Sequence, residues 1–297
     1  MEPVFDEQTL TRSVASCALR AMLYEVSTTP KPGLVDRNNS GSHKDMDFFT
    51  FLDSAIVLAP WFGTMFRIGL DGTGVAAGKL FARLREVGLA AEQDMRAASG
   101  GANTHKGLIF SLGILCASLG AEYAACRFLP LPLSRVLELS SRLGRCSLAD
   151  FSRPQEQETA GLSVYRDYRV AGVRGEAAAG FPSALNIACA QIKQWTGLGL
   201  PLNDAAAIAL LHLIASATDT NMIHRSNMAA AKRRMAEAAG LAREITPENF
   251  QSLLLRLDEE YIGENLSPGG CADLLSLGLM FWLLEKEALV TADVPRR

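Results

Sequence analysis

The stretch TPKPGLVDRNNSGSHKDMD, residues 29–47, lies between two segments with helical periodicity and is the least helix-like part of the first third of the chain. Its prolines and glycines exclude a continuous helix, because proline lacks an amide donor and glycine is conformationally loose. Cations and carboxylates alternate along it, a mixture expected where phosphates and a divalent cation are bound together. A solvated loop whose charges pair with one another is the alternative, and the same chemistry recurring downstream favours the binding role.

Apolar residues recur at three- and four-residue steps on both sides of this stretch, which predicts amphipathic helices. The expected helices cover residues 7–26, 48–66, 75–87, 108–120, 134–148, 159–169, 183–195, 203–218, 228–239, 247–262 and 272–287. Sustained strand alternation, hairpin turns and solenoid repeats are absent from the sequence. We therefore predict an all-α fold, a single multi-helix domain over residues 1–297, with the active site formed by interhelical loops at one end.

The composition narrows the class of protein. A hydrophobic share of 48%, a charged share of 21% and a net charge of -3 are typical of a soluble globular protein without a nucleic-acid footprint. The six cysteines form no Cys-x-x-Cys pair, as expected for reduced core residues. No secretory signal is visible, and the apolar run at 108–120 is shorter than the roughly 20 residues of a membrane crossing. We expect a cytoplasmic protein with neither nucleic acid nor membrane as a partner.

Five polar elements hold nearly all the unusual charged residues, at 31–47, 103–106, 174–176, 219–225 and 265–273. Loops at one end of a helical bundle can converge on one pocket, where helix N-termini add amide donors suited to phosphate. Taken singly, each element could be a helix cap or an exposed ion pair. The glycine, lysine, serine and histidine motifs of P-loop, Rossmann, α/β-hydrolase and zinc-protease sites are absent, which disfavours a conventional kinase, dehydrogenase or hydrolase.

These elements, in the same order, resemble the blocks of the triphosphoribosyl-dephospho-CoA synthase family. The resemblance is carried by PKPGLVDR (30–37), GSHKDM (41–46), NTHKG (103–107), IFSLG (109–113), TAG (159–161), GVRGEA (172–177), GFP (180–182), DTN (219–221) and NLSPGGCADLL (265–275), and covers nearly the whole chain. It implies an all-helical enzyme that joins ATP to 3′-dephospho-CoA, releases adenine and makes 2′-(5″-triphosphoribosyl)-3′-dephospho-CoA. That product is the precursor of the acyl-carrier prosthetic group of citrate lyase or malonate decarboxylase. The first two blocks look more like the citrate lyase branch.

One departure from the family pattern follows the DTN block. Family members commonly carry Arg-Gly-Gly, whereas this chain has Arg225, Ser226 and Asn227. Without the two glycines, either the backbone does not approach a phosphate closely here, or Asn227 adopts the left-handed conformation in place of glycine.

The implied reaction is a pentosyl transfer, in which the ribose 2′-hydroxyl of dephospho-CoA attacks C1′ of ATP and adenine leaves. An oxocarbenium-like transition state needs a carboxylate base, a proton donor to adenine and cations on the triphosphate. The catalytic candidates are Glu176 as first choice for the base, with Asp36 and His105. The nucleotide- and phosphate-binding candidates are Lys31, Arg37, His43, Lys44, Asn103, Thr104, Lys106, Arg174, Asn221, Arg225, Ser267 and Gly269. The Mg²⁺ candidates are Asp45, Asp219 and Asp273.

Other interpretations stay open at this point. A structural ion pair between Arg174 and Glu176 is the alternative to a catalytic Glu176. A nucleotide or ADP-ribosyl N-glycosidase, in which water replaces the acceptor, would use the same kind of pocket, and a non-enzymatic scaffold would only deliver the precursor. The resemblance further implies that the product passes to a transferase acting on an acyl-carrier subunit. The apolar helices at 209–215 and 274–284 would suit a homodimer interface or burial within the subunit.

Overall fold

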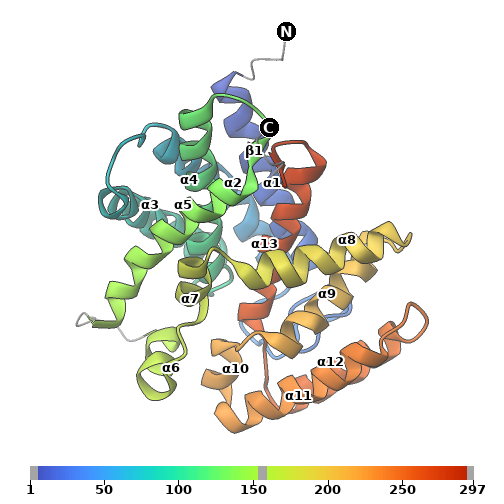
Figure 1. Cartoon of the computed structure of the whole chain (residues 1–297). Helices are drawn as coiled ribbons and strands as arrows, with labels where there is room; N and C mark the ends of the chain where they lie inside the picture. Colours follow the sequence, from blue (N-terminus) through green and yellow to red (C-terminus); the bar gives the residue numbers. More distant parts are fainter. Residues whose placement is uncertain (1–5, 153–158, 293–297) are drawn as a thin grey trace.

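Helices make up nearly all the regular structure of the computed structural model, which describes residues 6–152 and 159–292 (Figure 1). The prediction of an all-α fold is confirmed. In chain order the elements are α1 (Glu7–Ser27), α2 (Phe48–Leu70), α3 (Ala77–Ala98), α4 (Lys106–Cys126), β1 (Leu131–Pro132), α5 (Leu133–Cys146), η1 (Ser147–Ser152), α6 (Ala160–Tyr168), α7 (Gly172–Ala179), η2 (Ala184–Cys189), α8 (Ala190–Gly197), α9 (Leu202–Ser216), α10 (Thr220–Arg225), α11 (Met228–Glu244), α12 (Phe250–Gly263), α13 (Gly269–Lys286) and β2 (Val290–Thr291).

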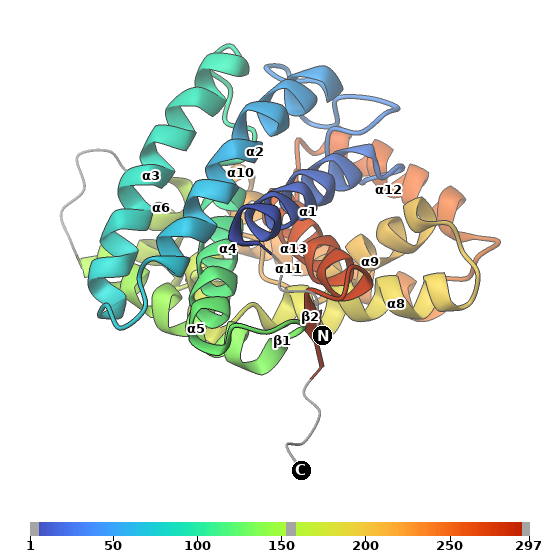
Figure 2. The same cartoon turned by 90° about the horizontal axis from the view of Figure 1, so that it is seen from above.

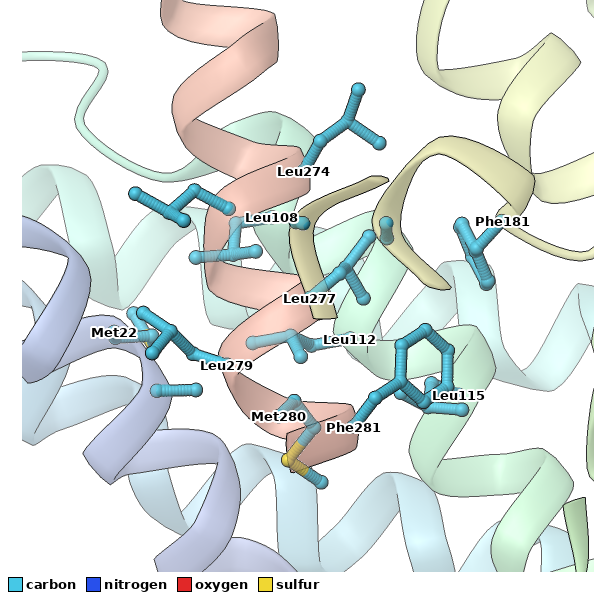
Figure 3. Packing of buried hydrophobic residues seen from close by; sticks show 14 of the residues in the cluster. Met22, Leu108, Leu112, Leu115, Phe181, Leu274, Leu277, Leu279, Met280 and Phe281 are labelled. Atoms are coloured by element: carbon cyan, nitrogen blue, oxygen red, sulfur yellow. The ribbon is translucent and has the colours of Figure 1, made fainter. Parts of the chain in front are cut away.

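The helices α4 and α13 form the centre of the molecule. Seen from above, α1, α4 and α13 lie in the middle, with α3 and α5 on one side and α8, α9 and α12 on the other (Figure 2). Apolar side chains face one another here, and Figure 3 shows Leu112 and Leu115 of α4 near Leu277 and Phe281 of α13. One continuous hydrophobic core extends from Leu10 to Val290. The limits of the domain, residues 1–297, stay a prediction.

Two short helices occupy segments that the sequence predicted to be loops. Asp219 caps α10, since its Oδ1 accepts hydrogen bonds from the amides of Asn221 at 2.8 Å and Met222 at 3.0 Å. The helix α7 ends at Gly180, which has a φ of 83°. Helix α3 is also longer than expected and continues to Ala98. The glycines in these segments had suggested loops, but they terminate or admit short helices instead.

Two helices, α2 and α4, are long and apolar enough to cross a membrane by length and composition. That test is weak evidence, because the core helix of a soluble protein also passes it. Most of the apolar window of α4 is buried inside the protein, where it packs against α2, α3, α5 and α13. A central position in the core therefore accounts for the apolar character of α4.

Candidate active site

A cavity of about 1090 Å³ collects residues from all five polar elements. Every candidate residue predicted from the sequence lines it except Asp36, Arg37 and Lys44. The lining candidates are Lys31, His43, Asp45, Asn103, Thr104, His105, Lys106, Arg174, Glu176, Asp219, Asn221, Arg225, Ser267, Gly269 and Asp273. In Figure 1, the N-terminal end of α13 points toward α10, so the fourth and fifth elements meet there. Segments far apart in the chain thus share one concave site, while the role of each residue stays a prediction.

Several charged residues of the cavity were missed by the sequence reasoning. Glu25 ends α1, Arg85 and Glu92 lie on α3, and Asp150 lies in η1. Each of these residues belongs to an amphipathic segment without a local motif. A single charged residue in such a segment usually lies on the solvent-exposed face, so nothing in the sequence assigned it to a site. Of these residues, only Glu25 could have been suspected of a role in the site, because it comes just before the first polar element in the sequence.

The first polar element is folded by the Asp36 carboxylate. Its Oδ2 accepts a hydrogen bond from the Lys31 amide at 3.0 Å, and its Oδ1 accepts from the amides of Asn38 at 2.7 Å and Asn39 at 3.1 Å. The side chain is buried and lies outside the cavity lining. Its catalytic role stays a prediction, and its observed contacts are those of a loop-forming residue.

Glycine is required where this loop meets α12. Gly33 has a φ of 68°, and a Cβ atom there would lie 2.3 Å from the Leu266 carbonyl oxygen. Its amide donates to Asp258 Oδ1 at 2.8 Å, and the Asn39 side chain donates to Asp258 Oδ2 at 2.7 Å. Asp258 of α12 therefore fixes the loop against the rest of the protein.

The candidates Arg37 and Lys44 do not line the cavity. Arg37 donates to Thr29 Oγ1 at 3.2 Å and to Asn203 Oδ1 at 2.9 Å, which joins the loop to α9. Lys44 is exposed. Phosphate binding by Arg37 and Lys44 stays a prediction, and their location outside the cavity lining does not support it.

Lys31 lines the cavity wall as half of a buried ion pair. Its ammonium contacts the Glu25 carboxylate, and the two side chains are 2% and 5% exposed. Burial raises the pKa of Glu25, and the Lys31 ammonium opposes that shift. Because the Lys31 ammonium neutralises the Glu25 carboxylate, it contributes less net positive charge to the binding of a phosphate.

Arg225 and His43 join three polar elements. Arg225 donates through Nη1 to the Ser42 carbonyl at 3.0 Å and through Nη2 to His43 Nδ1 at 3.2 Å. Because Nδ1 accepts, the proton of the neutral ring is on Nε2, which donates to Ser267 Oγ at 2.9 Å. Burial, then the charge of Arg225, lowers the pKa of His43 to about 4, so the ring stays neutral at pH 7.

Asn227, one of the two residues that replace the glycines of the family pattern, lies at the start of α11. Asn227 caps α11, since its side chain accepts a hydrogen bond from the Ala230 amide at 2.9 Å. Its φ is -166°, which is extended backbone that any residue adopts. Of the two alternatives drawn from the sequence, the left-handed conformation of Asn227 is therefore wrong, because the side chain serves as a helix cap instead.

Two arginines share one carboxylate in the cavity. Arg85 donates to both oxygens of Asp150, at 2.7 and 2.8 Å, and Arg174 contacts Asp150 Oδ2 at 3.4 Å. The Arg174 guanidinium also lies over the Phe151 ring, while its Nε is buried without a hydrogen-bond partner. Two cations on one carboxylate leave net positive charge, which suits an anionic ligand.

Lys106 and Asn103 begin α4 at the cavity. The Lys106 amide donates to Asn103 Oδ1 at 3.3 Å, and its ammonium pairs with Glu92 of α3 at 2.6 Å. The Lys106 side chain is half-exposed. An exposed ion pair of this kind contributes little to stability, so Lys106 can be redirected to a phosphate at small cost.

Glu176 is held by Ser183. The Ser183 hydroxyl donates to Oε1 at 2.6 Å and its amide donates to Oε2 at 3.2 Å. The sequence alternative, a structural pair with Arg174, is not among the ion pairs of the described residues, where Arg174 pairs with Asp150. Two donors on one carboxylate fix its orientation in the cavity.

His105 belongs to a small network with Ser54 and Thr104. The Thr104 hydroxyl donates to Ser54 Oγ at 2.9 Å, and Ser54 donates to the Phe51 carbonyl at 3.1 Å. His105 Nδ1 lies 2.8 Å from Ser54 Oγ and 3.1 Å from Thr104 Oγ1. His105 Nε2 is buried without a partner, and burial lowers the pKa of His105 to about 3.

Asp219 and Asp273 lie at the start of α13. Asp219 Oδ2 accepts from the Cys271 amide at 2.8 Å in addition to its two bonds to α10. Burial raises the pKa of Asp219, and these amides oppose the shift. Burial also raises the pKa of Asp273 well above its ordinary value, and the charges of Glu25 and Asp219 add to this.

Three glycines make room for these side chains. A Cβ atom at Gly107 would lie 2.2 Å from Asp273 Oδ2, and one at Gly270 would lie 3.0 Å from Asp219 Oδ2. A Cβ at Gly269 would lie 2.7 Å from the Asn221 side-chain nitrogen. The first turns of α4 and α13 therefore approach the acidic residues as closely as only glycine permits.

A metal site made by the protein alone is absent from residues 6–152 and 159–292, which hold no group of three His, Cys, Asp or Glu able to bind an ion. Magnesium bound to nucleotide phosphates needs only one or two carboxylates, with water completing its shell. Asp45, with a side chain 64% exposed, has free oxygens, whereas those of Asp219 already accept amide protons.

The described geometry fits the chemistry of nucleotides. Arg174, Arg225 and Lys106 offer charge for phosphates, and carboxylates that differ in hydrogen bonding offer acid and base groups. The volume of the cavity, about 1090 Å³, is at the upper end of the range of about 300–1,000 Å³ that is typical of ligand sites.

Comparison with known proteins identifies a family. The model of the CitG family, described as ATP:dephospho-CoA triphosphoribosyl transferase, matches residues 11–291. A probable 2-(5''-triphosphoribosyl)-3'-dephosphocoenzyme-A synthase of Vibrio cholerae is 37% identical over 277 residues, covering 90% of this chain and 86% of that protein. A probable synthase of the same name from Streptococcus equi is 36% identical, covering 96% of this chain and 98% of that protein.

A longer relative also matches. Protein CitXG of Leuconostoc mesenteroides is 38% identical over 276 residues, which cover 89% of this chain and only 57% of that protein. No solved structure was found to match the chain. The resemblance predicted from the ordered blocks is confirmed, and the chain belongs to the ATP:dephospho-CoA triphosphoribosyl transferase family.

Proposed function

We propose that this protein is a pentosyltransferase that joins ATP to 3′-dephospho-CoA, releasing adenine and forming 2′-(5″-triphosphoribosyl)-3′-dephospho-CoA. The observation that carries the proposal is the convergence of the five polar elements, in a chain that matches the family model, on one cavity with both cations and carboxylates. Two relatives that are probable synthases of this product support the assignment. The triphosphate is not cleaved in this reaction, so the cations hold it in place rather than activate it.

Glu176 is the proposed base for the 2′-hydroxyl of dephospho-CoA. Its two hydrogen bonds from Ser183 orient the carboxylate at the cavity wall, where a base must be positioned to accept the hydroxyl proton. Arg174, Arg225 and Lys106 are the proposed phosphate contacts, because all three line the cavity. ATP would enter as its Mg²⁺ complex, and Asp45 is the carboxylate best able to reach that ion.

The test is an assay of adenine and product with purified protein, ATP, Mg²⁺ and dephospho-CoA. We expect adenine release only with the acceptor, in equal amount to a product whose mass is the sum of both substrates less adenine. Adenine released without acceptor would indicate an N-glycosidase. A protein that binds the nucleotides without releasing adenine would indicate a scaffold, and Glu176→Gln would then leave its function intact.

The proposal also covers the next step of the pathway, the cellular location and the oligomeric state. The product would pass to a transferase acting on the acyl-carrier subunit of citrate lyase or malonate decarboxylase, and the first two blocks favour citrate lyase. We propose a cytoplasmic enzyme without a nucleic-acid or membrane partner. A homodimer is testable by light scattering, since α9 and α13 are largely buried within the subunit and other faces would have to form it.

A further inference from the structure

Arg85 and Arg174 line the cavity and share a single carboxylate, that of Asp150. Arg85 Nη2 donates to both Asp150 oxygens, at 2.7 and 2.8 Å, and Arg174 Nη2 lies 3.4 Å from Oδ2. The N–H groups on Nε and Nη1 of both arginines have no acceptor within the part of the chain that the structure describes, and Arg174 Nε is buried. This arginine pair therefore keeps charged donors that a ligand could satisfy.

Arg234 shows how a structural arginine is bonded in the same protein. Its Nε and Nη2 donate to Glu264, and its Nη1 donates to Glu237 and Glu260. Three carboxylates thus surround one guanidinium, which lies outside the cavity lining. In the cavity the ratio is reversed, because two guanidinium groups share one carboxylate. The bonding of the arginine pair is therefore incomplete in a way that stability alone does not explain.

An aromatic ring supports each guanidinium of the arginine pair. The Arg85 guanidinium carbon lies 5.1 Å from the centre of the Phe81 ring, and that of Arg174 lies 5.6 Å from the centre of the Phe151 ring. Phe151 in turn stacks on Tyr165 of α6, with 3.6 Å between the ring centres. A guanidinium already held by such contacts loses less conformational freedom when it binds a phosphate. The arginine pair is therefore in place before a ligand binds.

The two guanidinium groups meet at one point. Both Nη2 atoms contact the same atom, Asp150 Oδ2, so a single phosphate group can reach both. Two cations and one carboxylate leave net positive charge on this wall of the cavity. Because guanidinium groups bind phosphate oxygens through paired N–H donors, the chemistry of the site fits a nucleotide phosphate chain.

We propose that Arg85 binds a phosphate chain of a substrate together with Arg174, and that Asp150 is the positioning residue that aligns the two guanidinium groups. This rests on the proposed function, in which both substrates carry such a chain. The ligand is a nucleotide di- or triphosphate group, which is the diphosphate of dephospho-CoA or the triphosphate of ATP. The arginine pair forms no covalent bond and transfers no proton, so it acts through the affinity for the nucleotide.

The first experiment measures nucleotide affinity without turnover, by calorimetric titration of the full chain with MgATP and, separately, with dephospho-CoA. We expect Arg85→Ala to raise Kd for at least one nucleotide by about ten- to a hundredfold, the range for losing a charge-assisted hydrogen bond. The nucleotide affected identifies the source of the phosphate. Because the Arg85 side chain is 38% exposed, the variant should stay folded. Arg83→Ala, which removes an exposed arginine of α3 outside the cavity lining, is the matched control and should keep both Kd values.

A second titration separates a phosphate contact from a change in cavity shape. Adenosine is part of both nucleotides but has no phosphate, so Arg85→Ala should leave its Kd unchanged. Equal losses for adenosine and for the nucleotide would overturn the proposal. Arg85→Lys keeps the charge without the planar fork and should recover part of the affinity.

The positioning role of Asp150 has a test of its own. Asp150→Asn adds net positive charge, yet it should weaken nucleotide binding, because the two arginines lose the carboxylate that aligns them. Tighter binding would contradict the positioning role. If native protein releases no adenine while Arg85→Ala still loses nucleotide affinity, the proposed function fails and the phosphate site stands. If native protein releases adenine and Arg85→Ala keeps both native Kd values, only this inference fails.

Discussion

Asp36 and Asp273 both lie in the polar elements of the sequence, yet their surroundings are opposite. Asp36 accepts three backbone amides and helps to fold residues 29–47, whereas Asp273 accepts none among the described residues and keeps surface in the cavity. Arg225 and His43 resemble Asp36 in being bonded to each other and to neighbouring loops, and His105 Nε2 resembles Asp273 in having no partner among the described residues. The comparison teaches that two aspartates of similar sequence context can differ in role: Asp36 is bonded to the loop that it folds, while the unbonded oxygens of Asp273 are available to a ligand.

The largest effect is expected from breaking the buried Glu25–Lys31 pair. Lys31→Met leaves a buried carboxylate uncompensated and should lower the free energy of unfolding by about 3–5 kcal/mol in urea titrations. The double variant Lys31→Met/Glu25→Gln should recover much of that loss. Unchanged stability with weakened ATP binding would instead return Lys31 to the phosphate-binding role predicted from the sequence.

A smaller loss is expected at Gly33. An alanine there needs a left-handed backbone and a Cβ 2.3 Å from a carbonyl oxygen, so Gly33→Ala should cost about 2–3 kcal/mol. Gly74, with a φ of 79° and nothing near its Cβ position, separates the two causes. Gly74→Ala should cost only about 1 kcal/mol in the same thermal or urea unfolding measurement. Equal losses would mean that the approach to Leu266 is unimportant.

The smallest effect tests the comparison most directly, because the two aspartates should respond with opposite signs. Asp36→Asn removes an acceptor from buried amides and should cost about 1–2 kcal/mol of unfolding free energy. Asp273→Asn removes a carboxyl whose ionisation is disfavoured in the folded state, so at neutral pH it should stabilise the protein by about 0.5–2 kcal/mol. If both substitutions lowered the free energy of unfolding by the same amount, the proposed difference between Asp36 and Asp273 would be wrong.

The pH dependence follows from the direction of the Asp273 shift. Its pKa is raised on folding, so the folded state binds more protons and native stability falls as pH rises from the unfolded pKa through the folded one. The gain from Asp273→Asn should therefore be present at neutral pH and vanish below about pH 4, near the unfolded value. Urea unfolding of both proteins across this range measures it. A gain that is constant with pH would show that packing, not charge, is responsible.

The sequence by itself determined the helical fold and the family. Helical periodicity is local, so segments such as 7–26 and 272–287 could be recognised without knowing their neighbours. Ordered blocks such as NTHKG and NLSPGGCADLL also identified the family, because each holds several residue types at fixed spacing. Short helices such as α7 and α10 were missed, since glycines and a capping aspartate resemble loop chemistry in a linear reading.

Only the tertiary structure decided which charged side chains are bonded within the protein and which face the cavity. Arg37 and Arg174 look alike in the chain, but one is bonded to α9 and the other lines the cavity. Glu25 and Arg85 join the site from helices with no local motif, and Gly107 acquires its meaning from Asp273, far away in sequence. Whether a polar group finds a partner depends on contacts across the fold, and burial then sets the cost of leaving it without one.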